Sequence, residues 1–269
     1  YLLELPSRIK VLILSDIHDG VTYCPNINNE AIGIADFLKS RKLDNKILLE
    51  ESTQEEVKLK ALWPNASHTK ALKKLALEND DIISFDIRPL LVPFSWELID
   101  VDKSLGNITL LKYLHLIEDF FNRKSILYTK YIYPEVQKLS IKNKKNSLHL
   151  KQLYNQYNEF KTMNKNLLNN NINNISTNIL EDINDIISHI MEWYIIVLIL
   201  NSDKNIIIHT GLAHSSKLIL MLTKYYKFNQ LEYKGINFFD ELKDKYKDTI
   251  PQACIFFDAN TKFKKKYLL

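Results

Sequence analysis

The fold class is decided by the stretch IKVLILSDIHDG, residues 9–20. Its first six residues are apolar except for Lys10, and β-branched residues are frequent among them. A short run of this kind is typical of a strand buried on both faces. The Asp19-Gly20 pair stops the run. We therefore predict a buried strand that leads into a polar loop carrying Asp16 and His18.

Similar apolar runs recur along the chain, each followed by charged or polar residues. We predict further strands at 46–49, 81–89, 205–209 and 253–258, and helices at 31–40, 55–79 and 215–226. Residues 109–200 are mostly helical in pattern, with a loop or spacer at the asparagine-rich segment 164–178. Strands that alternate with helices predict an α/β fold with a mostly parallel central sheet flanked by helices. We expect a single domain, 1–269, with a helical insertion at about 104–200 between the third and fourth strands.

Composition excludes several classes of protein. The 269 residues are 46% hydrophobic and 25% charged, which is typical of a globular chain. Two cysteines cannot build a disulfide framework, and they favour a reducing location, cytoplasmic or virion-associated. The net charge of +4 gives no strong nucleic-acid signal. Asparagine makes up about a tenth of the chain, which we interpret as the mark of an AT-rich genome.

Two other segments bear on location and partners. The longest apolar run, residues 195–200, is far shorter than the roughly 20 residues of a membrane span. It continues a helical pattern from Ile179, so we predict a buried core helix and no transmembrane segment. The lysine-rich end, residues 262–266, is a solvated tail or a contact for anionic partners.

Ionisable residues follow four of the predicted strands. Open α/β sheets bind ligands outside the carboxyl ends of their strands, so these residues predict a site at one edge. The candidate catalytic residues are His18, Glu50, Arg88 and His214, and the supporting residues are Asp16, Glu51, Asp86 and His209. The remaining histidines, at 68, 115, 149 and 189, have no ionisable partner at useful spacing and are interpreted as structural.

The candidate set suits two kinds of hydrolytic site. A histidine acts as a general base near neutral pH, a glutamate positions water, and Arg88 stabilises an oxyanion. A divalent metal bound by Asp16, His18, Glu50 and His214 would instead lower the pKa of its bound water. Structural roles stay open as well: Asp16 as a cap, Asp86 with Arg88 as an ion pair, and His209 as a core histidine.

The runs VLILSDIHDG, ILLEES, ISFDIRPL, MEWYIIVLIL and IIIHTGLAHSSKLILML resemble the superfamily of erythromycin esterases, ChaN-like haem-binding proteins and TIKI/TraB proteases. They are most similar in texture to giant-virus proteins with D-I-H, L-E-E and D-I-R runs. The resemblance places residues 15–18, Glu50, Arg88 and residues 211–214 at the positions of the superfamily's motifs. Ser15-Asp16 stands where Gly-Glu is usual, so the first acid is shorter here.

The resemblance implies an ester or amide hydrolase acting on a small ester or a peptide. Because the superfamily is functionally mixed, a non-catalytic virion or host-interaction protein that keeps the fold is the alternative. A lesser alternative is a metallophosphoesterase, which ILSDIHDG resembles at its opening motif. The G-D-x-x-D, G-N-H-D/E and G-H-x-H motifs of those enzymes are not in the sequence.

Overall fold

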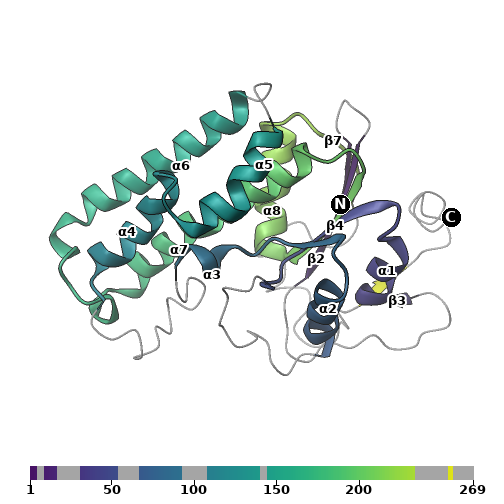
Figure 1. Cartoon of the computed structure of the whole chain (residues 1–269), viewed down its shortest axis with the longest axis horizontal. Coiled ribbons are helices and arrows are strands. Elements are labelled where there is room, and N and C mark those ends of the chain that lie inside the picture. The colour runs from purple at the N-terminus through teal and green to yellow at the C-terminus, as the bar shows by residue number, and fades with distance from the viewer. Residues whose placement is uncertain are drawn as a thin grey trace. The chain divides into compact units, whose positions relative to one another are not determined.

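The computed structural model of the chain describes residues 1–4, 9–16, 31–53, 67–92, 108–139, 144–233 and 254–256. Its elements are strands and helices of an α/β protein (Figure 1). Contacts divide it into two compact units. The first comprises Tyr1–Thr53, Lys58–Ser84 and Ser202–Leu269, and the second comprises Gln54–Val57 and Phe85–Asn201. That the chain is one domain with an insertion at about 104–200 stays a prediction.

The first unit contains a six-stranded sheet in the order β5-β4-β6-β2-β1-β7. The strands are β1 (Leu2–Glu4), β2 (Lys10–Asp16), β4 (Asn45–Leu49), β5 (Ile82–Ser84), β6 (Asn205–Gly211) and β7 (Asn229–Glu232). Neighbours from β5 to β2 are parallel, whereas β1 pairs antiparallel with both β2 and β7. The sheet is therefore mixed, and the prediction of a mostly parallel sheet was wrong.

The antiparallel edge has a physical cause in the connection lengths. Few residues separate β1 from β2, which is too short a link for the crossover that parallel strands need. Neither β1 nor β7 exceeds four residues, and the side chains of β7 are mostly exposed. Such short segments carry no apolar run that a sequence pattern could detect.

The last predicted strand exists but belongs to a different sheet. Strand β8 (Cys254–Phe256) pairs antiparallel with β3 (Ala31–Gly33), with Ile32 opposite Ile255. The helix predicted at 31–40 therefore begins later, as α1 (Ile34–Arg41). Of the helix predicted at 55–79, the structure describes α2 (Ser67–Leu77), and residues 55–66 lie outside the described residues.

The two faces of the sheet are set by one row of apolar side chains in register. Leu12, Ile207, Ile47 and Ile82 lie side by side across four strands. They form one core cluster with buried side chains of α1 and α2. Because strand side chains alternate, the intervening residues face the other way. Helix α8 (Leu212–Lys224) lies on that second face, since the Ser215 hydroxyl contacts Ser15 of β2.

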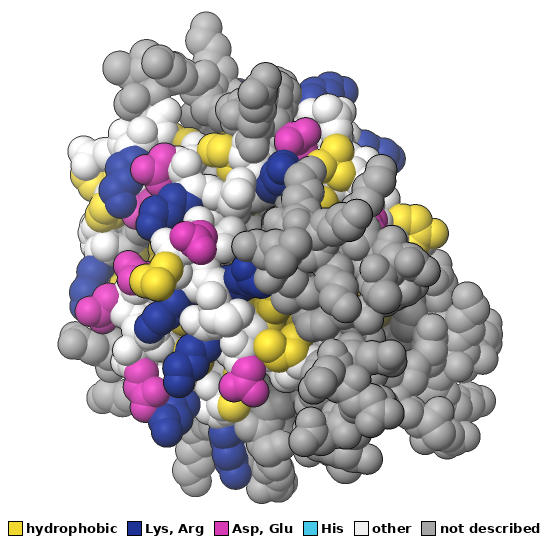
Figure 2. Space-filling model, turned by 90° about the vertical axis from the view of Figure 1, so that its right-hand side faces the viewer, with side chains coloured by type: hydrophobic (Ala, Val, Ile, Leu, Met, Phe, Trp, Pro, Cys, Tyr) yellow, Lys and Arg dark blue, Asp and Glu magenta, His cyan; other side chains and the backbone are white. Residues whose placement is uncertain are grey.

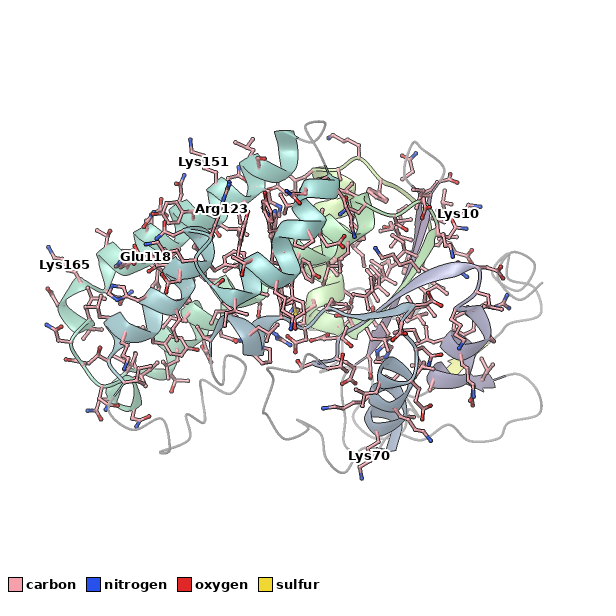
Figure 3. The ribbon with its side chains drawn as sticks, in the orientation of Figure 1. Lys10, Lys70, Glu118, Arg123, Lys151 and Lys165 are labelled. Atoms are coloured by element: carbon pink, nitrogen blue, oxygen red, sulfur yellow. The ribbon has the colours of Figure 1, made fainter. Side chains whose placement is uncertain are left out.

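The second unit is helical, as predicted for residues 109–200. Its helices are α3 (Arg88–Leu91), α4 (Leu110–Phe121), the π-helix Leu127–Ile132, α5 (Tyr133–Lys138), α6 (Lys144–Met163) and α7 (Thr177–Leu200). The predicted spacer at 164–178 contains two short 3₁₀-helices, Lys165–Leu167 and Ile172–Asn174. Helices α4 and α6 are joined by the Tyr157 hydroxyl, which donates to the Leu114 carbonyl, and by Lys161, which lies 2.9 Å from Glu118. Glu118 is labelled on α4 in Figure 3.

Helix α7 is the one described helix long and apolar enough to cross a bilayer. Its most apolar window has a mean hydropathy of 1.6, and 78% of that window is buried. Trp193 packs edge-on against Phe120 of α4, with ring centroids 6.2 Å apart. These contacts agree with the predicted buried core helix.

Replacing Ile207 tests the register row. Ile207 is 1% exposed and has neighbours on both sides of β6. We expect Ile207→Ala to lower the free energy of unfolding by about 2–5 kcal/mol, and Ile207→Val by about 0.5–1.5 kcal/mol. Urea titration measures both values. Leu231→Ala on the exposed edge strand β7 is the control and changes stability by less than about 0.5 kcal/mol. Equal losses of stability in Ile207→Ala and Leu231→Ala would contradict the placement of Ile207 in the buried row.

Burial makes His149 of α6 a source of acid sensitivity. Its pKa lies below the ordinary value of 6.5 because of burial and nearby His189, partly offset by the fully buried Glu192. The unfolded chain therefore binds more protons than the folded one just below pH 6.5, so stability falls as the pH drops through that window. We expect thermal unfolding across a pH series to show a weaker acid loss for His149→Gln. The half-exposed His115, replaced by Gln, is the control, and an equal weakening there would contradict the prediction.

Candidate functional site

Three parallel strands deliver polar residues to the carboxyl edge of the first unit's sheet. Strand β2 ends at Asp16, which lies beside Gly211 of β6, and His209 lies beside Leu49 of β4. The chain then passes directly from β4 into Glu50, whose amide donates to the His209 carbonyl at 3.0 Å. The edge therefore brings together residues that are distant in sequence, as expected where the carboxyl ends of parallel strands meet.

The carboxylate of Glu50 is fixed by two short hydrogen bonds. Its Oε2 atom accepts from the Thr210 hydroxyl at 2.6 Å and from the Gly211 amide at 2.7 Å. Hydrogen bonds to an ionised carboxylate are stronger than neutral ones and hold it in one orientation. The Glu50 side chain is only 6% exposed, so solvent competes little for these donors. Glu50 thus ties the end of β4 to the junction between β6 and α8.

His214 lies against the other oxygen of the same carboxylate. Its Nε2 is 3.5 Å from Glu50 Oε1, and the imidazole is 13% exposed. Gly211 adopts an extended conformation at the N-cap of α8, so the helix begins at once and His214 falls in its first turn. The distance is longer than an ordinary hydrogen bond, so the contact is a close approach of the imidazole to the carboxylate. A fixed carboxylate beside a partly exposed imidazole can support general acid–base chemistry.

A second acid–imidazole pair lies on the opposite face of the sheet. His209 Nε2 is 3.5 Å from Asp16 Oδ2, and these residues are 2% and 3% exposed. Both side chains share the face of Leu12 and Ile207, whereas Glu50 contacts the Thr210 side chain on the other face. Alternation along β6 therefore separates the two pairs. The ends of β2, β4 and β6 lie at one edge of the sheet, but the side chains of Asp16 and His209 lie on one face and those of Glu50 and Thr210 on the other.

The sequence did not single out the hydroxyl residues of this edge. The Ser15 hydroxyl donates to the Ser215 oxygen at 2.8 Å, and Ser215 donates to the Leu212 carbonyl at 2.9 Å. Thr210, which holds Glu50, is opposite Ser15 in the register. Ser15 directly precedes the candidate Asp16, and Thr210 directly follows the candidate His209. Because neighbouring side chains of a strand point to opposite faces, these two hydroxyl residues could have been identified as the polar residues of the other face.

Asp86 and Arg88 form a buried bidentate ion pair in the second unit. Arg88 Nε donates to Asp86 Oδ1 at 2.8 Å, and its Nη2 donates to Oδ2 at 3.0 Å. Strand β5 ends at Ser84, so both residues lie beyond it, and Arg88 begins the short helix α3. The strand predicted at 81–89 is thus too long. The geometry matches the structural alternative, an ion pair.

Glu51, His18 and the predicted metal ligands are the remaining candidate residues. Glu51 follows Glu50 in a half-buried turn, where its amide donates to the Leu49 carbonyl. His18 lies outside the described residues, as does the lysine-rich end. Among the described residues, no three His, Cys, Asp or Glu side chains are grouped to hold a metal ion. Asp16 faces away from Glu50 and His214, so the described members of the metal set do not fit one ion.

The buried pair of the second unit predicts an asymmetric response to mutation. Asp86→Ala leaves the Arg88 guanidinium, 9% exposed, without the carboxylate that neutralises it. We expect a loss of about 3–5 kcal/mol in the free energy of unfolding. The double variant Asp86→Leu with Arg88→Met should be more stable than Asp86→Ala, because neither charge is then buried alone. Chemical denaturation measures the difference, and a double variant less stable than Asp86→Ala would contradict a mainly structural pair.

A scan against protein-family models, a search of curated proteins and a search of solved structures found no match to this chain.

Proposed function

We propose that the protein is a hydrolase that activates water at His214, with Glu50 as partner acid, to cleave an ester or amide bond. The observation that carries the proposal is the geometry of Glu50. Its carboxylate is held by the Thr210 hydroxyl and the Gly211 amide, and its other oxygen faces the imidazole at 3.5 Å. Paired groups of this kind at the carboxyl end of parallel strands occupy the usual ligand position of an α/β sheet.

The chemistry needs one proton acceptor and one water molecule. The neutral imidazole of His214 takes a proton from water as the water oxygen attacks the substrate carbonyl carbon. The Glu50 carboxylate stabilises the imidazolium that forms. The imidazolium then returns its proton to the leaving oxygen or nitrogen as the bond to the carbonyl carbon breaks. Acid and alcohol, or acid and amine, are the products, and the imidazole is neutral again.

The other candidate residues take lesser roles in this proposal. Asp16 and His209 are nearly inaccessible, so they support the strand ends from within the core. The Arg88 guanidinium is engaged by Asp86, and a role as oxyanion clamp would require it to bind substrate beside that partner. The substrate class that fits is a small ester or a peptide.

A non-catalytic virion or host-interaction protein is the second candidate. The deep burial of Asp16 and His209 favours it, because such pairs also stabilise a scaffold that carries no reaction. On the face seen in Figure 2, described Lys and Arg side chains are interspersed with Asp and Glu. A protein partner would there meet a mixed surface rather than one of a single sign. The cytoplasmic or virion-associated location belongs to the same proposal.

A hydrolysis panel on matched variants separates the two candidates. We expect the wild type to hydrolyse at least one member of a panel of small esters and peptide amides. His214→Ala should lower kcat by about 10²- to 10⁴-fold, the usual contribution of a positioned general base. His115→Ala, which removes a half-exposed imidazole of the second unit, is the control and should retain full activity. Full activity in His214→Ala would refute the assigned role, and an inactive wild type would favour the scaffold.

Metal content gives the same experiment a second readout. Activation by His214 requires no bound ion, so we expect hydrolysis to survive treatment with a chelator. Elemental analysis of gently purified wild type and His214→Ala protein accompanies the assay. Near-stoichiometric metal that is lost in the variant would overturn the metal-free version and would place His214 among metal ligands.

A further inference from the structure

We infer that Thr210 is a positioning residue that sets the tautomer of His214, so that Nε2 carries the proton and Nδ1 is the atom that accepts the proton from water. The inference starts from the different contacts of the two oxygens of the Glu50 carboxylate. Oε2 of Glu50 accepts two hydrogen bonds, from Thr210 at 2.6 Å and from the Gly211 amide at 2.7 Å. Oε1 faces Nε2 of His214 at 3.5 Å.

Two donors on one oxygen determine how the carboxylate is oriented. A carboxylate rotates about its terminal bond unless hydrogen bonds fix it, because that torsion has a broad energy minimum. The Thr210 hydroxyl and the Gly211 amide come from adjacent residues at the end of β6, so both act from one rigid strand. Oε1 is then directed toward α8, where His214 lies in the first turn. The orientation of Oε1 therefore depends on Thr210.

The oriented oxygen selects one form of the neutral imidazole. In neutral histidine one ring nitrogen is a donor and the other is an acceptor, and the hydrogen bond of one nitrogen decides which. An ionised carboxylate oxygen only accepts, so the nitrogen that faces it carries the proton. That nitrogen is Nε2. The lone pair of the neutral ring is then on Nδ1. The role of Nδ1 as general base rests on the proposed hydrolysis, whereas the tautomer and its dependence on Thr210 do not.

Thr210 is suited to this role by burial as well as by reach. It is fully buried, and it lies opposite Ser15 in the parallel register. A valine has nearly the same shape but no hydroxyl, so Thr210→Val removes the donor with little change in packing. Serine keeps the hydroxyl and removes only a methyl group. The pair of variants therefore separates hydrogen bonding from volume.

The test is nitrogen NMR of the ring of His214 in isotope-labelled, full-length protein without substrate, at a pH where the imidazole is neutral. We expect the wild type to favour the form protonated at Nε2 by about tenfold or more, because a carboxylate oxygen 3.5 Å away attracts an N–H group and repels a nitrogen lone pair. Thr210→Val should reduce that ratio by about threefold to tenfold, and Thr210→Ser should restore it. Thr223→Val is the matched control: its hydroxyl donates to the Ile219 carbonyl within α8, and its loss should leave the ratio unchanged.

Each result decides the inference. Protonation at Nδ1 in the wild type would overturn it, as would a folded Thr210→Val protein with the wild-type ratio. If Thr210→Val does not fold, Glu50→Gln provides the second measurement, since an amide can both donate and accept and should also lower the ratio. A wild type that shows the expected tautomer but hydrolyses nothing would retain the positioning role and reject the hydrolase. Activity with the opposite tautomer would reject the positioning role alone.

Discussion

The parallel pairing of β6 with β2 on one side and β4 on the other is the constraint on which the rest of the first unit depends. It aligns Leu12, Ile207 and Ile47 in one row, and that row forms the core under α1 and α2. The same register continues to the carboxyl ends of the strands. It therefore determines which polar side chains meet and on which face they do so. A shift of β6 by one residue would exchange the faces of His209 and Thr210 and would separate both acid–imidazole pairs.

The strands of the parallel part and the start of α8 could be predicted from the sequence, because both follow from local patterns. Apolar runs ending in Asp16, Glu50 and His209 identified the strands of the parallel part, since strands buried on both faces are continuously apolar. The start of α8 after Gly211 was also anticipated, near residue 215 rather than 212. These predictions needed only neighbouring residues. They did not need knowledge of which strands pair.

The features that the sequence did not reveal depend on pairing or on weak segments. Strands β1 and β7 are held by the sheet edge rather than by their own composition, so the mixed character of the sheet was missed. Nothing in the local sequence marks Thr210 as important, because its hydrogen bond to Glu50 depends on the pairing of β6 with β4. Asp86 and Arg88 were expected on a strand, but β5 ends at Ser84, so Asp86 lies between β5 and α3 and Arg88 begins α3. The ion pair forms in spite of that, because the two residues are close in sequence.

The two donors that hold Glu50 differ in how evolution or a protein engineer can change them. The Thr210 hydroxyl belongs to a side chain, so most substitutions at residue 210 abolish it. The donor at residue 211 is a main-chain amide, which every amino acid except proline possesses. One of the two hydrogen bonds to Glu50 therefore depends on the identity of the side chain at residue 210, and the other depends only on the path of the backbone at residue 211. A substitution at residue 211 other than proline would keep this amide, so one of the two hydrogen bonds that tie the Glu50 carboxylate to the β6–α8 junction would persist whatever side chain stands there.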